Sequence, residues 1–219
     1  VNESPTAIAL SGGSAAENSA GASFGTLSTT DPDTSDSFTY SVTGGTDSAS
    51  FEIGSSNTLK FKSTVSGNYE SKSSYSVIVT STDAGSNTYA ETLTVSITNV
   101  NEAPSFTTAT GSQVAENSTA VLTAAASDPE GGSLTYSLLD SAGNDGAKFS
   151  ITSAGVLTFN RAPDYEIPAD LNENNVYIVY IQVSDGTFST TLMYHVYVTD
   201  VTEAAGLETP DNVQTVETK

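Results

Sequence analysis

An internal repeat of about 100 residues constrains the fold of this 219-residue chain more than any other feature. Short segments of the first half return in the same order in the second half. The matching pairs are Ala16–Ser19 with Ala115–Ser118, Asp31–Asp33 with Asp128–Glu130, Thr39–Ser41 with Thr135–Ser137, Leu59–Phe61 with Leu157–Phe159, and Asn68–Glu70 with Asp164–Glu166. The boundary Val1–Glu3 returns as Val100–Glu102 and Val201–Glu203. The sequence therefore predicts repeats at 1–101 and 102–203, followed by a polar tail at 204–219.

Within each repeat the hydrophobic pattern is that of short β-strands. Leu93, Val95 and Ile97 alternate with Thr and Ser, which makes one face apolar and the other polar. Similar short runs are separated by clusters of Gly, Asn, Asp and Ser, and no segment follows the helical period. We therefore predict an all-β chain of two tandem immunoglobulin-like Greek-key β-sandwiches stacked end to end.

Charge and residue content exclude several classes of function. With 26 Asp and Glu against 6 Lys and Arg, the net charge of -20 excludes ordinary nucleic-acid binding and anionic membrane surfaces. No apolar run is long enough for membrane insertion. A single His, no Cys and no Gly-rich phosphate loop predict that the chain is not an enzyme. Without disulfides, an extracellular fold needs another stabilising element, for which bound metal and a merely solvated acidic surface are the two interpretations.

Many acids lie at the strand ends and boundaries of the repeats. In a sandwich of this kind Glu17, the turn at Asn68 and Glu70, and the linker at Asn101 and Glu102 are expected to meet at one pole of repeat 1. Repeat 2 contributes a second set, and all of these groups offer oxygen, which suits Ca²⁺ better than zinc. The second set is Asp128, Glu130 and Asp185.

A structural role for the same acids is the alternative. Asp31, Asp128 and Asp185 belong to Asp-Pro or Asp-Gly pairs, which are common in turns. Glu17 and Glu116 belong to no turn signature, and this favours the metal interpretation.

Taken in order, these motifs resemble the cadherin-like tandem repeats of large bacterial surface adhesins of the RTX type. The motifs are Ala-Glu-Asn at 16–18 and 115–117, Asp-Pro-Asp at 31–33, Asp-Pro-Glu at 128–130, Asp-Tyr-Glu at 164–166, Val-Ser-Asp-Gly at 183–186 and Asn-Val-Asn-Glu-Ala-Pro at 99–104. The resemblance implies an extracellular protein at a cell surface, with Ca²⁺ between successive repeats stiffening a rod that serves adhesion. Its other partners are then neighbouring repeats of the same parent chain.

Carried over residue by residue, the resemblance implies two further half-sites. The half that pairs with a preceding repeat comprises Asp31, Asp33 and Asp83. The half that pairs with a following repeat comprises Glu116, Asp164, Glu166, Asp200 and Glu203.

The last two strands of repeat 2 suggest a different function. Their alternation predicts an outward-facing set in place of the Thr and Ser of repeat 1, namely Ile178, Tyr180, Met193, His195 and Tyr197. Exposed aromatic side chains stack on sugars or on another protein, so a carbohydrate-binding module is the alternative function. The long segment 161–175 is expected either to leave this patch open or to cover it.

Overall fold

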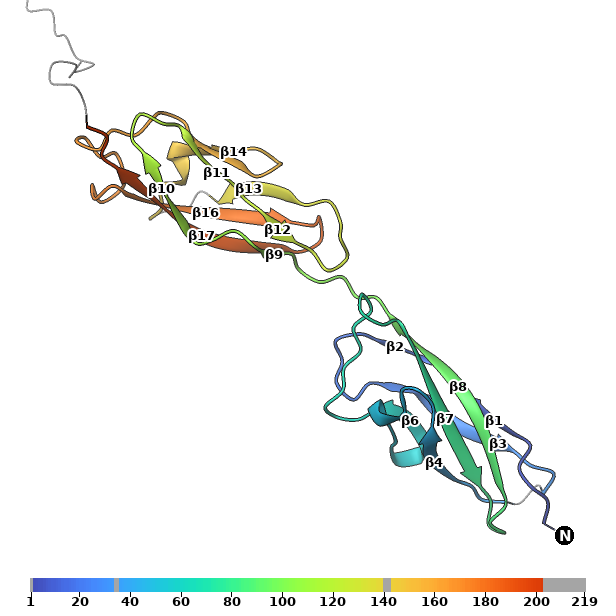
Figure 1. Cartoon of the computed structure of the whole chain (residues 1–219). Helices are drawn as coiled ribbons and strands as arrows, with labels where there is room; N and C mark the ends of the chain where they lie inside the picture. Colours follow the sequence, from blue (N-terminus) through green and yellow to red (C-terminus); the bar gives the residue numbers. More distant parts are fainter. Residues whose placement is uncertain (1, 34–35, 140–142, 203–219) are drawn as a thin grey trace, which may run out of the picture. The chain divides into compact units, whose positions relative to one another are not determined.

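The computed structural model describes residues 2–33, 36–139 and 143–202, and the predicted tail and Glu203 lie outside them. The chain divides into two compact units, Val1–Asn101 and Glu102–Lys219. The described residues contain β-strands and three short 3₁₀ turns, η1 (Ser48–Ser50), η2 (Ser55–Asn57) and η3 (Gly146–Lys148), and no α-helix. The predicted all-β class is confirmed (Figure 1).

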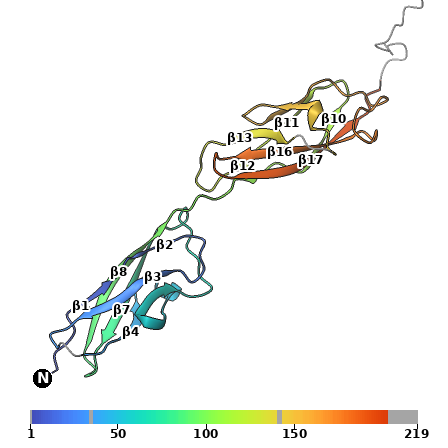
Figure 2. The same ribbon diagram turned by 180° about the vertical axis from the view of Figure 1, so that it is seen from behind.

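The first unit is a sandwich of two four-stranded sheets (Figures 1 and 2). One sheet has the order β1 (Ala7–Leu10), β3 (Ser23–Thr30), β6 (Thr58–Phe61) and β5 (Phe51–Ile53). The other has the order β2 (Ser14–Ala16), β8 (Thr88–Thr98), β7 (Ser74–Thr82) and β4 (Thr39–Gly44). The chain crosses between the sheets after β1, β2, β3, β4 and β6, so strands that are distant in sequence pair.

The first strand of this unit is divided between the two sheets. β1 pairs antiparallel with β3, whereas β2 pairs parallel with β8. Gly12 and Gly13 lie between them with φ of +103° and +100°, and a Cβ on Gly12 would lie 2.9 Å from the carbonyl oxygen of Phe24. Glycine is therefore required for the switch. Because β2 runs parallel to β8, both strands end at the same pole, where the chain leaves the unit.

The second unit repeats this plan. One sheet has the order β10 (Gly111–Ala115), β17 (Ser189–Thr199), β16 (Val176–Ser184) and β13 (Thr135–Leu139), with β10 parallel to β17. The remaining pairings are β11 (Ala120–Thr123), β15 (Val156–Phe159) and β14 (Phe149–Ile151) in one group, and β12 (Ala126–Ser127) with β9 (Ser105–Phe106) in another.

Each unit encloses its own core, to which every second residue of the long strands contributes. In β16 the residues Tyr177 to Val183 are buried at alternate positions, as period-2 alternation requires. Aromatic rings fill the centres: Phe24 and Phe61 meet edge to face with centroids 4.8 Å apart, and the centroids of Phe149 and Phe159 lie 4.3 Å apart. Burying each such ring contributes about 1.5–3 kcal/mol, so the units need no disulfide.

Candidate metal sites

Glu17 follows directly after β2 and ties together the chain segments at one pole of the first unit. Its side chain is 3% exposed, and one carboxylate oxygen accepts the backbone N–H of Tyr69 at 2.7 Å. The other oxygen accepts the N–H of Val100 at 2.8 Å. The carboxylate thus fixes the turn at 68–70 beside the residues that leave the unit.

Glu116 makes the same contacts in the second unit. It is 4% exposed, and its two carboxylate oxygens accept the N–H groups of Tyr165 and Val201, each at 2.8 Å. Asn18 and Asn117, which follow the two glutamates, have φ near +60°. The repeated geometry is therefore a property of each unit's own fold. Neither glutamate belongs to a local turn, as the sequence indicates, but both have a structural role as acceptors for backbone donors distant in sequence.

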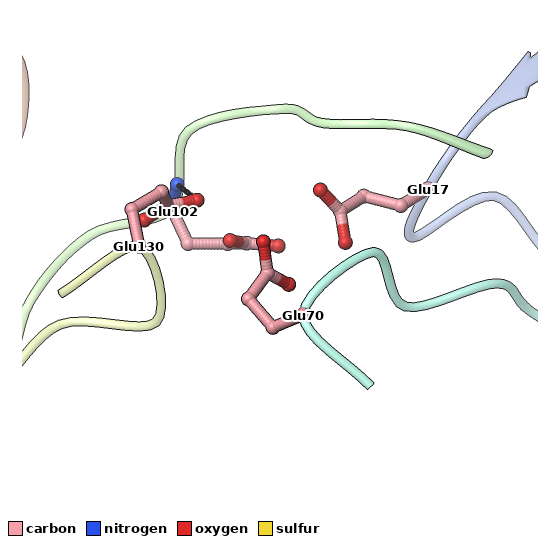
Figure 3. Close-up of side chains that lie close together, drawn as sticks. All are labelled: Glu17, Glu70, Glu102 and Glu130. Atoms are coloured by element: carbon pink, nitrogen blue, oxygen red, sulfur yellow. Dashed lines mark hydrogen bonds between the residues drawn. The ribbon is translucent and has the colours of Figure 1, made fainter. Parts of the chain in front are cut away.

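Further acids surround each of these glutamates. In the first unit, carboxylate oxygens of Glu17 and Glu70 lie within 4.8 Å of each other (Figure 3). In the second unit, Glu116, Glu166 and Asp200 form such a group at the same distance. The N–H of Glu166 itself lowers its pKa, but burial and the charges of Glu116, Asp200 and Asp164 outweigh this and raise the pKa. This repulsion is what a bound cation would relieve.

At the opposite pole of the first unit a second group of acids converges. Carboxylate oxygens of Asp31, Asp36 and Asp83 all lie within 4.8 Å of one another. One oxygen of Asp31 and one of Asp36 are buried without a hydrogen-bond partner. Burial first, and then the charges of Asp31, Asp33 and Asp83, raise the pKa of Asp36. Buried carboxylate oxygens without donors fit a hard cation.

The turn that carries Asp31 in the first unit and the turn that carries Asp128 in the second have the same hydrogen-bonding pattern. The N–H of Asp33 donates to Asp31 at 2.8 Å, and the N–H of Glu3 donates to Asp33 at 2.7 Å. The charge of Asp33 is the main reason that the pKa of Glu3 is raised.

In the second unit the N–H of Glu130 donates to Asp128 at 3.2 Å, and the N–H of Glu102 donates to Glu130 at 3.3 Å (Figure 3). Hydrogen bonding with the side chain of Glu102, and then with its backbone N–H, lowers the pKa of Glu130. Both units therefore aim a pair of carboxylates at the point where the chain enters.

Several predicted ligands have clear structural partners. Oδ1 of Asn68 accepts the N–H of Ser71 at 2.7 Å, and Oδ1 of Asp164 accepts that of Ile167 at 2.9 Å. Oδ1 of Asp185 accepts the N–H groups of Thr187 and Phe188, each at 2.6 Å. Among the described residues, Asp164 and Asp185 belong to none of the acid groups whose carboxylate oxygens lie within 4.8 Å of one another. Asn101 is exposed in the linker.

Asp83 is both an acceptor for protein donors and a member of an acid group that could hold a metal ion. It is 6% exposed, and its Oδ1 accepts the N–H of Asn87 at 2.8 Å while its Oδ2 accepts the amide of Asn2, also at 2.8 Å. Burial alone would raise the pKa of Asp83, but the hydrogen bonds from Asn87 and Asn2 hold it below the usual value. An ionised Asp83 is therefore available beside Asp31 and Asp36.

Sequence reasoning missed Asp36. The alignment of the two repeats selected acids that occur in both, and at the corresponding place the second repeat has the Gly-Gly-Ser of 131–133. Its position in the sequence could have indicated it, because Asp36 lies only three residues after the Asp31–Asp33 motif.

The donor sets consist of oxygen alone. Ca²⁺ takes 6–8 oxygen ligands, and each group of three carboxylates supplies part of such a shell, with backbone carbonyls and water as further donors. His195, the chain's one histidine, lies on β17 and belongs to none of these groups. The residues present thus fit calcium and do not fit a metal that prefers nitrogen or sulfur.

Comparison with known proteins identifies the type of domain. Residues 12–98 match the family model of the cadherin domain, and residues 101–195 match that of a bacterial Ig domain. The chain is a pair of cadherin-like repeats. We refer to the two units as repeat 1 and repeat 2. No curated protein matches the chain in a sequence search.

Solved structures with the same fold are cadherin repeats. Human protocadherin-24 EC1-2 superposes with a TM-score of 0.66 at 19% identity, covering 91% of this chain and all of that one. The protocadherin gammaB4 extracellular domain gives 0.55 at 24% identity, and mouse cadherin-23 EC22-24 gives 0.57 at 22% identity, each covering 90% of this chain. The chain spans 34% of the gammaB4 domain and 65% of the cadherin-23 fragment. At these identities the likeness shows the fold.

The family carries general expectations. Cadherin domains are extracellular, typically bind calcium and mediate adhesion, and neither matched family is enzymatic. Within the described part of the chain, no helix is long and apolar enough to cross a bilayer.

The outer face of repeat 2 carries the predicted apolar side chains. Met193 is 46% exposed and Tyr197 is 45% exposed, while Ile178, Tyr180 and His195 are partly buried. Tyr180 lies opposite Met193, and the rings of His195 and Tyr197 stack at 6.2 Å. The segment 161–175 contacts the inward-facing side of β16 instead, where the N–H of Ala169 donates to the hydroxyl of Tyr177. It therefore leaves Met193 and Tyr197 accessible.

Proposed function

We propose that this chain is a calcium-binding segment of an extracellular adhesin, in which Ca²⁺ ions bound between successive cadherin-like repeats stiffen a rod-like array. The observation that carries the proposal is the duplicated arrangement of carboxylates in each repeat. Acids converge where the chain enters the repeat and, around Glu17 or Glu116, where it leaves.

Chain connectivity supports sharing of an ion between repeats. Val100, whose N–H binds Glu17, is separated from Glu102 by Asn101 alone, and the N–H of Glu102 binds Glu130. The residues at the exit of repeat 1 and those at the entry of repeat 2 are thus covalently joined by one residue, Asn101. A cation that takes 6–8 oxygens completes its shell by drawing on both sets. In this proposal the acids around Asp31 and those around Glu116 serve adjoining repeats in the same way.

Small-angle scattering of the double variant Glu102→Ala/Asp128→Ala tests this function. We expect wild type in calcium to show a narrower distribution of interatomic distances than wild type in EDTA, because a bound ion restricts the angle between repeats. The double variant in calcium is expected to resemble wild type in EDTA, with both sandwiches still folded by circular dichroism.

The matched control is Glu52→Ala/Glu91→Ala, which removes the same charge from β5 and β8. This control should retain the calcium effect. A wild-type profile that EDTA leaves unchanged would contradict the proposal, and so would a Glu102→Ala/Asp128→Ala variant that behaves as wild type.

The exposed side chains of Met193 and Tyr197 favour a second candidate, a carbohydrate-binding face on repeat 2. We expect wild type to bind a subset of a glycan array and Tyr180→Ala, at the centre of the patch, to lose that binding. The corresponding control is Thr94→Ala on the outer face of repeat 1. Absence of binding by wild type, or equal binding by Tyr180→Ala, would remove this candidate.

A further inference from the structure

Repeat 2 contains a surface hollow of about 550 Å³ whose lining includes none of Glu116, Glu166 and Asp200 and none of the outer-face side chains. Its wall is formed by the segment between β15 and β16, which spans residues 160–175 and is longer than its counterpart at 62–73 in repeat 1. Phe159 and Tyr177 form its floor, and Ile167, which is 73% exposed, stands at its rim. A volume of this size is within the range of small-molecule sites.

The hollow gathers the positive charge of repeat 2. Lys148 and Arg161, which are the described cations of this repeat, both line it. Lys148 forms no ion pair with any residue that the structure describes. In a chain with a net charge of -20, two cations at one opening make a local site for an anion.

Backbone hydrogen bonds fix the position of Lys148 at the hollow. It ends η3, its backbone carbonyl accepts the N–H of Asn160 at 2.8 Å, and its own N–H donates to the carbonyl of Asp145 at 2.9 Å. The amide of Asn160 donates to the carbonyls of Ala147 and Phe149. At the place of Lys148, repeat 1 has Ser50, whose carbonyl likewise accepts the N–H of Lys62. The backbone is thus the same in both repeats, and the cation is particular to repeat 2.

The hollow also offers an acceptor. Asp164 lines it, and its Oδ1 binds the N–H of Ile167 while the carboxylate stays exposed. The Asp164 carboxylate would repel a bare inorganic anion, and the many polar side chains of the lining do not match the long apolar chain of a fatty acid. A ligand that bears a carboxylate, several hydroxyl donors and an apolar face matches all three kinds of lining group.

We propose that this hollow binds an acidic sugar, with the sugar carboxylate held by Lys148 and Arg161, a hydroxyl donating to Asp164, and the apolar face against Ile167. The site is complete within repeat 2 and uses none of Glu116, Glu166 or Asp200. Asp164 is the one residue that the hollow shares with the predicted metal ligands, and it lies outside the acid group, so binding is expected in EDTA as well as in calcium.

Nuclear magnetic resonance titration of the full chain with D-glucuronate tests this inference, in parallel with D-glucose and acetate. We expect glucuronate to shift the amide signals of residues 117, 148 and 160–167 at concentrations of about 1–10 mM, typical of a small ligand with few contacts. Glucose, which lacks the carboxylate, and acetate, which lacks the sugar ring, are each expected to bind about tenfold more weakly or worse.

Variants locate the binding. Lys148→Gln and Arg161→Gln are each expected to weaken glucuronate binding about tenfold, because each removes a charge-assisted contact. Lys148→Arg should retain binding. Lys62→Gln removes an exposed cation from repeat 1, and Tyr180→Ala alters the outer face, so neither should change the affinity.

Binding of glucuronate with this pattern supports the inference. Absence of glucuronate binding, binding of glucose as tight as that of glucuronate, or wild-type affinity in Lys148→Gln and Arg161→Gln would overturn it. Loss of binding in Tyr180→Ala alone would assign the sugar to the outer face instead and would equally overturn it.

Discussion

Calcium at about 5 mM is expected to raise the melting temperature of this chain relative to excess EDTA. Extracellular modules bind Ca²⁺ with dissociation constants of about 10⁻⁴–10⁻³ M, so an ion that binds only the folded state adds about 1–2 kcal/mol. For a domain of about 100 residues this corresponds to about 4–8 °C for each kcal/mol. The physical reason is the repulsion among Asp31, Asp36 and Asp83 and among Glu116, Glu166 and Asp200, which the ion removes. Calorimetry or circular dichroism measures the shift, and a second addition of EDTA should reverse it.

Magnesium at the same concentration and ionic strength is the control for this measurement. Mg²⁺ gives up its water reluctantly and demands octahedral geometry, so a smaller shift is expected. Equal shifts in both salts would indicate general screening of a surface with a net charge of -20. Identical melts in calcium and EDTA would contradict the proposed metal sites and would leave the acids as solvated surface.

The second large effect is expected from Glu17→Ala, which should destabilise repeat 1 by about 2–4 kcal/mol even in EDTA. The substitution removes two part-buried hydrogen bonds, from the N–H groups of Tyr69 and Val100 to a charged carboxylate, and each bond of this kind contributes about 1.5–3 kcal/mol. Urea unfolding, monitored by the hydrogen exchange of amides in repeat 1, measures the decrease in the free energy of unfolding. Glu116→Ala is expected to have the same effect on repeat 2, because its carboxylate binds Tyr165 and Val201 in the same way.

Glu70→Ala separates the structural role from the metal role. Glu70 is exposed, so its removal in EDTA should change the free energy of unfolding by less than about 0.5 kcal/mol. In calcium the same variant should lose part of the stabilisation that wild type gains. If Glu17→Ala is as stable as Glu70→Ala in EDTA, the hydrogen bonds of Glu17 contribute little to the fold. If Glu70→Ala keeps the full calcium effect, Glu70 is not a ligand.

Local patterns predicted the faces of the strands correctly. Alternation along β16 and β17 places Tyr177, Val179 and Tyr194 inside and Met193 and Tyr197 outside, as observed. Such patterns are reliable because side chains on a strand alternate between two faces, whatever the rest of the chain does.

The acids were harder to interpret because their roles depend on neighbours distant in sequence. Glu17 binds Val100, which lies 83 residues away along the chain, so nothing in the local sequence reveals that it is a backbone acceptor. Asp185 and Asp164 bind donors two or three residues away and do follow the turn rules for such residues. The assignment of individual ligands stays a prediction that the melts and variants above address.

The sequence by itself determined the all-β class, the internal repeat and the oxygen-only character of any metal site, since these follow from periodicity and residue type. The tertiary structure alone decided which acids converge. It brought Asp36 to Asp31 and Asp83, placed Glu17 and Glu116 as acceptors at the exit of each repeat, and collected Lys148 and Arg161 at one hollow. The reason is that strand pairing and crossing between sheets bring together residues that no short-range pattern connects, and charges interact through space rather than along the chain.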